Sequence, residues 1–151
     1  MALVIEDGSG IENADSFADA TAYRAWVLKY FNETVTDDEA AIEAAIHRTV
    51  AYMNTLNWLG TQDHELCFPR DSATAIPKAV INAQHAFTKA ELETPNALSP
   101  SIQGGNQSVL KKAGDIEFEI IQSTGNERVN INMAMDFINP LIVSNVKYLI
   151  R

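Results

Sequence analysis

Residues 36 to 56 carry the pattern of a long helix with one apolar face. Side chains suited to a core recur there at spacings of three and four, which places them on one face of a helix about five turns long. They are Ile42, Ala45, Ile46, Thr49, Val50, Met53 and Leu56. In front of them, Thr36 and Glu39 form a capping box, in which each side chain can satisfy the other residue's backbone N–H. The sequence therefore predicts the central helix of the core here.

Two further segments carry helical signals. Asp19 is a predicted N-cap for a helix that ends near Phe31-Asn32. Ile76-Pro77 opens another helix, because proline at the first helical position loses no needed hydrogen bond, and Thr94-Pro95 ends it. Its predicted buried stripe is Val80, Ala83, Phe87 and Ala90.

The carboxy-terminal third is less regular. Residues 96 to 108 are rich in Ser, Gly, Asn, Gln and Pro and predict a flexible connection. Residues 109 to 120 indicate a hairpin, because apolar residues alternate with glutamates in its second strand. Residues 131 to 138 show helical spacing, and Pro140 limits how far that helix extends. The last stretch, 141 to 151, is apolar for a terminus and is expected to dock somewhere.

The amino terminus and the loop 57–75 complete the chain. Leu3-Val4-Ile5 is a short strand candidate, ended by a glycine-containing turn over residues 6 to 10. Residues 57 to 75 lack periodicity but contain two aromatic residues, so this loop is expected to be pinned to the surface.

These elements predict a mainly α fold, a bundle of about four helices with a small β-hairpin and an extended C-terminal tail. The 151 residues fit one domain. Its expected parts are a helical core at about 15–94, a flexible linker and hairpin at about 95–124, and a C-terminal helix and docking tail at about 129–151. A 46% hydrophobic share with 21% charged residues is that of an ordinary globular protein and not of a disordered chain.

The sequence shows no signal for a membrane or for secretion. No apolar run reaches the length of a membrane span, and the amino terminus lacks the basic and apolar segments of a secretory signal. We therefore expect the protein to stay inside the cell that makes it. Its single cysteine, Cys67, lies between Leu66 and Phe68, which favours a buried thiol over a catalytic one.

The net charge of −9 is unevenly distributed. Residues 1 to 76 carry 13 acidic against 4 basic residues, whereas residues 77 to 151 carry 7 of each. Nucleic-acid binding draws most of its affinity from Lys and Arg, and the 11 such residues form no cluster beyond Lys111-Lys112. The composition argues against a DNA-binding protein.

Candidate chemical groups are few. His64 has Asp63, Glu65 and Cys67 nearby, but the spacing matches neither a zinc-finger pair nor a helical HExxH motif. His47 and His85 lie on predicted helices, and spacing assigns no nucleophile to them. We therefore expect no catalytic, cofactor-binding or metal-binding residues.

Other patterns have simpler explanations. The glycines at 8, 10, 104 and 105 lack the lysine and the following helix of a phosphate loop, so they indicate turns. The acids at 37 to 39 are explained by helix capping. Tyr23, Trp26 and Tyr30 could stack on bases, although packing of an amphipathic helix is the commoner reason for such residues.

Short motifs occur in a fixed order along nearly the whole chain. They are Leu3-Val4-Ile5-Glu6-Asp7-Gly8 with Ala14-Asp15-Ser16-Phe17, then Trp58-Leu59-Gly60, Leu66-Cys67-Phe68-Pro69-Arg70, Ile76-Pro77-Lys78-Ala79-Val80, Ala113-Gly114-Asp115-Ile116-Glu117-Phe118 and Asn139-Pro140-Leu141. In this order the motifs resemble a family of small tailed-bacteriophage proteins that sit between portal and tail, some of which carry the label DnaT-like single-stranded-DNA-binding protein. Phe68 stands where tryptophan is common in the family, and Asp115 where proline is usual.

The resemblance implies a structural virion protein, a head-to-tail adaptor whose copies form a dodecameric ring below the portal and extend the DNA channel. Its implied partners are other copies of itself, the portal protein and a tail or tail-completion protein, either nozzle or stopper. DNA would pass through the channel without specific binding, with no membrane involved. The implied location is the head-tail junction of the virion, and the host cytoplasm during assembly.

Ring formation requires two different complementary surfaces on each subunit. The hairpin and the apolar carboxy-terminal tail are the predicted contacts, because neither looks fully buried within one chain. The acidic amino-terminal half, if it faces the channel, would keep DNA from adhering.

Two other classes of function stay open. The first is a single-stranded-DNA-binding protein of phage replication, in which aromatic side chains stack on bases. The second is a small enzyme, which only the neighbourhood of His64 supports. Oligonucleotide binding at low salt tests the first, and metal analysis tests the second.

Overall fold

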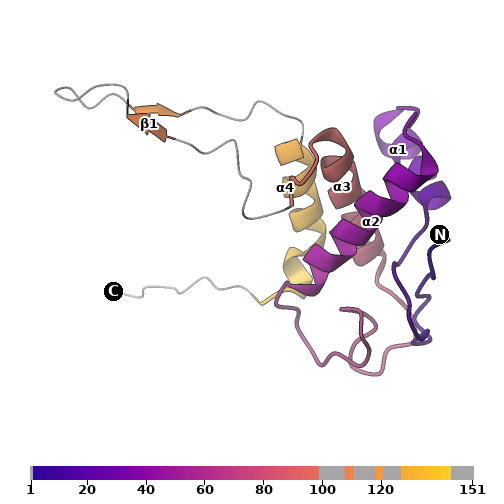
Figure 1. Ribbon diagram of the computed structural model, residues 1–151. Helices are drawn as coiled ribbons and strands as arrows, with labels where there is room; N and C mark the ends of the chain where they lie inside the picture. The colour runs from indigo at the N-terminus through magenta and orange to yellow at the C-terminus, as the bar shows by residue number, and fades with distance from the viewer. Residues whose placement is uncertain (1, 99–107, 111–117, 121–126, 144–151) are drawn as a thin grey trace, which may run out of the picture.

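The chain folds into a bundle of helices (Figure 1). The computed structural model describes residues 2–98, 108–110, 118–120 and 127–143. Within them lie the α-helices α1 (Ala20–Phe31), α2 (Glu39–Asn54), α3 (Lys78–Glu93) and α4 (Glu127–Ile138), and the 3-10 helix η1 (Asn139–Leu141). The predicted mainly α fold is confirmed.

Helix α1 begins and ends where the local sequence predicts. The Asp19 side chain accepts a hydrogen bond from the Ala22 backbone N–H at 2.7 Å, which satisfies one of the unpaired donors of the first turn. Asn32 ends the helix in the left-handed region, with φ of 54°, a conformation that asparagine tolerates.

Helix α2 starts two residues later than a Thr36 cap would place it. Its N-cap is Asp38, whose carboxylate accepts from the Ala41 N–H at 2.7 Å, so the predicted capping box of Thr36 and Glu39 is wrong. Aspartate is as good a cap as threonine, and its charge also favours the positive end of the helix. The predicted apolar face is confirmed, since Ile42, Ala45, Ile46, Thr49, Val50 and Met53 are all buried.

The central helix is α3, and the prediction of α2 for that place is wrong. Helix α3 packs against α1, α2 and α4. Its predicted stripe is buried, but so are Gln84, His85, Thr88, Lys89 and Glu91. A sequence pattern that counts only apolar residues underestimates the burial of α3, because its polar side chains find partners inside the protein. Pro77 precedes the first helical residue as the N-cap.

Helix α4 carries the predicted helical segment onto α3, with Ala134 and Ile138 fully buried. After η1 the chain pairs with the loop that follows α2. Trp58 and Ile142 form an antiparallel bridge, flanked by hydrogen bonds from Leu59 N to Leu141 O at 2.8 Å and from Val143 N to Asn57 O at 2.7 Å. The apolar end of the chain therefore docks on its own loop as far as Val143, while residues 144–151 lie outside the described residues.

The strands are short. β1 (Ser108–Leu110) pairs antiparallel with β2 (Phe118–Ile120), with Leu110 opposite Phe118. Residues 111–117 between them lie outside the described part, so the predicted hairpin stays a prediction. The expected amino-terminal strand amounts to a single parallel bridge between Ile5 and Ser16. None of the described helices is long and apolar enough to cross a membrane.

Candidate functional site

The side chain of Arg70 makes several of the contacts that hold the long loop after α2 together. Its guanidinium donates to the backbone carbonyls of Gly60 at 2.7 Å, Leu59 at 2.9 Å and Cys67 at 3.2 Å. Arginine suits this role because its planar fork presents several donors in fixed directions. The Trp58-Leu59-Gly60 and Leu66–Arg70 motifs are thus two ends of one structural clamp, and the prediction of a pinned loop is confirmed.

Gly60 is required by the same clamp. It has φ of 83°, and a Cβ atom at this position would overlap the carboxylate of Asp71. That carboxylate accepts a hydrogen bond from Thr61 N at 2.7 Å. The loop therefore depends on glycine for both its conformation and its space.

The amino-terminal turn is built around a buried carboxylate. Glu6 is 2% exposed and accepts from the backbone N–H groups of Gly8 at 2.8 Å, Gly10 at 2.9 Å and Ile11 at 2.7 Å. Three backbone donors compensate much of the cost of burying this charge. The predicted glycine turn is confirmed, and its organising residue, Glu6, was not identified from the sequence.

Gln84 of α3 attaches the segment after this turn to the core. Its side-chain oxygen accepts from Phe17 N at 2.9 Å and Ser16 Oγ at 3.2 Å, and its nitrogen donates to Ala18 O at 3.0 Å. The Ala14–Phe17 motif is explained by these contacts, because the main chain there is held by a fully buried amide.

A cleft of about 520 Å³ lies between the amino-terminal turn and the loop after α2. It is lined by Glu6, residues 10–14 and residues 63–66. The imidazole of His64 lies directly against Gly10, where a Cβ atom would overlap the ring. This cleft is the candidate functional site, because it brings His64 together with acidic side chains from two distant segments.

The rim of the cleft is acidic. Asp63 accepts a hydrogen bond from Ser72 N at 2.6 Å. Glu12 and Glu65 are exposed, and their carboxylates have no hydrogen bond or ion pair within the described part of the chain. Ile11 and Leu66 add apolar surface to the same lining. The cleft therefore offers unpaired negative charge beside an apolar wall, which suits a partner with cationic and apolar groups.

The geometry brings no catalytic set together at His64. Among the described residues, no group of three or more His, Cys, Asp or Glu side chains could hold a metal ion. Cys67 is 1% exposed, as predicted, and burial raises the pKa of its thiol to about 12. A thiol that stays protonated is a poor nucleophile.

The aromatic residues of α1 do not form a stacking platform. Tyr23 and Trp26 are buried in the core, and Tyr30 is the exposed aromatic side chain, at 48%, among those that the structure describes. Burial raises the pKa of Tyr23, with Asp37 and Glu93 adding to the effect. The packing interpretation of these aromatics is therefore confirmed.

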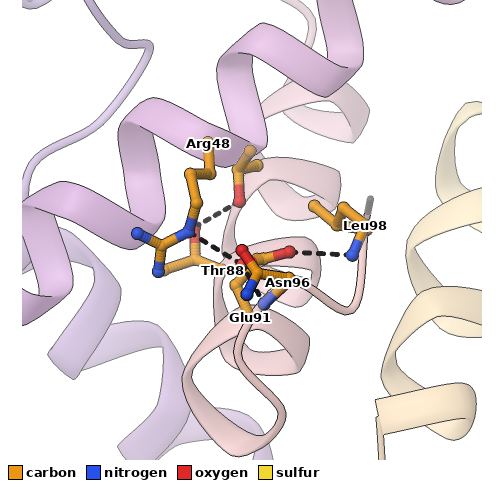
Figure 2. A network of polar contacts seen from close by, with 6 residues as sticks. Arg48, Thr88, Glu91, Asn96 and Leu98 are labelled. Carbon is orange, nitrogen blue, oxygen red and sulfur yellow. Dashed lines mark hydrogen bonds and ion pairs between the residues drawn. The ribbon is translucent and has the colours of Figure 1, made fainter. Parts of the chain in front are cut away.

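Glu91 organises a second buried network (Figure 2). This 1% exposed carboxylate accepts from Arg48 Nε at 2.9 Å, Leu98 N at 2.8 Å and Asn96 N at 3.1 Å. Figure 2 shows these groups converging where α3 ends and the chain turns away. The start of the segment that leads to β1 is thereby fixed to the bundle.

Lys89 also forms ion pairs within the protein. Its ammonium lies 2.8 Å from carboxylate oxygens of both Glu33 and Glu93, and 4.9 Å from the centre of the Phe31 ring. Burial alone would lower the pKa of Lys89, but the hydrogen bonds to the two glutamates outweigh burial and raise it. Arg24 donates to the Asp37 carbonyl at 3.2 Å.

Most described cationic side chains are therefore used inside the chain. Arg24, Arg48, Arg70 and Lys89 each have a protein partner, whereas Lys29 and Lys78 are exposed without an ion pair in the region the structure describes. Lys29 lies 5.4 Å from the centre of the Tyr30 ring.

The fold and the cleft define a small helical-bundle protein with an acidic surface site. A comparison with protein families matches residues 1–151 to the family described as "Putative DnaT-like ssDNA binding protein". The chain therefore belongs to this DnaT-like family. The description agrees with the alternative function raised from the sequence and says nothing of a head-to-tail adaptor. Comparisons with curated proteins and with solved structures give no match.

Proposed function

We propose that this chain is a structural subunit of the head-to-tail adaptor ring of a tailed bacteriophage. The observation that supports the proposal is which charged side chains have partners within the protein. Arg48, Arg70 and Lys89 are bound to partners within the chain, while the carboxylates of Glu12 and Glu65 at the cleft have no partner among the residues that the structure describes. A protein that guides DNA without holding it benefits from such a surface, because like charges keep the polymer from adhering.

The polar scaffold supports a structural role as well. Gln84, Glu91 and Arg70 each tie two backbone segments together, and Glu6 holds the amino-terminal turn, so all four side chains support loop geometry. Three of these side chains belong to, or bind, the motifs shared with the phage family: Glu6 and Arg70 lie within such motifs, and Gln84 binds Ser16 and Phe17. A subunit whose loops are held in fixed positions presents the same contact surfaces in every copy, which a closed ring requires.

Single-stranded-DNA binding is the second candidate, and the description of the chain's family favours it directly. Its cationic groups would come mainly from the carboxy-terminal part, where Lys111, Lys112, Arg128, Lys147 and Arg151 occur. Binding of this kind weakens steeply as salt rises, because each neutralised phosphate releases counterions.

One infection experiment separates the two functions. Particles are collected after inactivation of this gene and scored by electron microscopy for DNA-filled heads and for attached tails. Separate heads and tails with normal DNA synthesis support the adaptor. Normal joining with failed DNA synthesis overturns it and favours the DNA-binding function.

A binding measurement complements that experiment. The full chain is titrated onto a fluorescent single-stranded oligonucleotide at low salt, with Lys111→Ala/Lys112→Ala as the test variant and Lys29→Ala/Lys78→Ala as the matched control. Binding that falls with salt and is lost only in the first variant would favour the second candidate. No change in anisotropy at low salt would remove it.

A further inference from the structure

The cleft and the β1–β2 ribbon each lack a partner within the described part of the chain. The ribbon pairs only with itself, since no contact between either strand and a described helix is present. A two-stranded ribbon alone is marginal in water and needs another surface to pack on. The two residues that follow β1 in the sequence are Lys111 and Lys112.

The cleft and the β1–β2 ribbon are attached to opposite ends of the bundle. Gly8 of the amino-terminal turn lies against the backbone of Thr74 and Ala75, just before α3 begins. The segment leading to β1 is held by Glu91 where α3 ends. Helix α3 has 16 residues, so these points are separated by about 24 Å along its axis. Figure 1 shows the loop after α2 at one end of the bundle and the end of α3 at the other.

We propose that the cleft of one copy binds Lys111 and Lys112, the residues that follow β1 in the sequence, of a second copy. This inference rests on the proposed adaptor function, and it names the contact by which neighbouring subunits join. Two different surfaces at opposite ends of one chain are what a head-to-tail contact needs, whereas a two-fold dimer would use one surface twice.

Charge complementarity selects the second copy as the occupant. The unpaired carboxylates of Glu12 and Glu65 face the space that the two ammonium groups would enter. Ion pairs at an exposed rim steer and orient more than they hold. Ile11, which is 36% exposed, supplies apolar surface against which the ribbon can pack, and the buried Leu66 lies behind it in the same lining.

A charge exchange tests the contact. Lys111→Glu/Lys112→Glu and Glu12→Lys/Glu65→Lys are prepared separately and combined in one full chain. Self-association is measured by sedimentation at low salt. Each double substitution alone is expected to raise the apparent dissociation constant for self-association at least about tenfold. The combined variant is expected to have a dissociation constant within about threefold of that of the natural chain. Lys29→Glu/Lys78→Glu is the control for the lysine pair, since it makes the same change in net charge at two exposed lysines that neither line the cleft nor belong to the ribbon.

The outcomes are distinct. Failure of the combined variant to recover, or an equal loss in the control, overturns the inference. A natural chain that stays monomeric at every concentration also overturns it. So does a crosslink that forms within a single chain between cysteines introduced as Glu12→Cys and Lys111→Cys. Loss of head-tail joining without this protein, together with unchanged self-association of the variants, would leave the proposed function standing and remove only this contact. Normal joining without the protein would remove the function itself.

Discussion

Acidification should destabilise this protein through one side chain, His85 of α3. The imidazole is 3% exposed and lies against α1, with its ring centre 5.6 Å from that of Trp26 and 6.1 Å from that of Tyr23. Its Nδ1 atom is buried without a hydrogen-bond partner in the described structure. Burial lowers the pKa of His85 from 6.5 to about 4, although the nearby Asp19 carboxylate opposes the change.

The sign follows from which state binds the proton. As the pH falls below 6.5, the unfolded chain gains a proton at His85, whereas the folded chain gains it only near pH 4. The contribution to stability is therefore complete above pH 6.5 and is lost between pH 6.5 and 4. A shift from 6.5 to about 4, at 1.36 kcal/mol for each pH unit, corresponds to about 3 kcal/mol. That is a large share of the 5 to 15 kcal/mol, roughly, by which domains are stable.

Urea unfolding followed by tryptophan fluorescence at several pH values between 7 and 4 measures this loss. His85→Leu removes the titrating group, so its free energy of unfolding should fall by about 3 kcal/mol less than that of the natural chain over this range. His47→Leu makes the same substitution at an exposed position of α2 and is the matched control. A difference between the natural chain and His85→Leu of under about 1 kcal/mol would refute the reasoning.

Three further outcomes are expected. Arg70→Lys should lower the free energy of unfolding by about 2 kcal/mol, because an ammonium cannot reach the same carbonyls, and Arg24→Lys, measured alongside by urea unfolding, should change it by less than about 0.5 kcal/mol. Glu91→Gln should lower the free energy of unfolding by about 2 kcal/mol, because the amide nitrogen of glutamine would face the Leu98 N–H, and neither group can accept a hydrogen bond. The Leu98 N–H should then exchange with solvent faster, and unchanged exchange would contradict the assigned role of Glu91. Deletion of residues 146–151 should abolish assembly on the portal while circular dichroism shows the monomer still folded, and unchanged co-assembly of the truncated chain would refute that prediction.

Local signals in the sequence located the helices well. Asp19 and Asn32 mark the two ends of α1, because capping depends on residues next to the helix. The start of α2 was misplaced since two good acceptors, Thr36 and Asp38, stand within three residues, and only the backbone shows which one accepts from Ala41.

Burial of polar residues could not be predicted in the same way. Gln84 bonds to Phe17, which is 67 positions away, and Glu91 bonds to Arg48, which is 43 positions away. No local periodicity reports such partners, so α3 looked less central than it is.

The candidate site was predicted only in fragments. His64 was singled out from the sequence because acids flank it, but the cleft also needs Gly10 and Glu12 from the amino-terminal turn. A signal for the turn did exist in the spacing of Glu6 with Gly8 and Gly10, which allows one carboxylate to collect several backbone donors. The Trp58–Gly60 and Leu66–Arg70 motifs were visible in the sequence, but the contacts that join them, from Arg70 to backbone carbonyls, appear only in the folded chain.

The bridge between Trp58 and Ile142 joins residues 84 positions apart in the chain. During synthesis, the loop after α2 therefore emerges from the ribosome long before the segment that closes its edge. Until residues 141–143 have been made, the N–H of Leu59 and the carbonyl of Asn57 have no chain to pair with. A truncated product would keep that edge open and would add as a strand to other chains more readily than a finished chain. Completion of the loop thus distinguishes finished chains from unfinished ones.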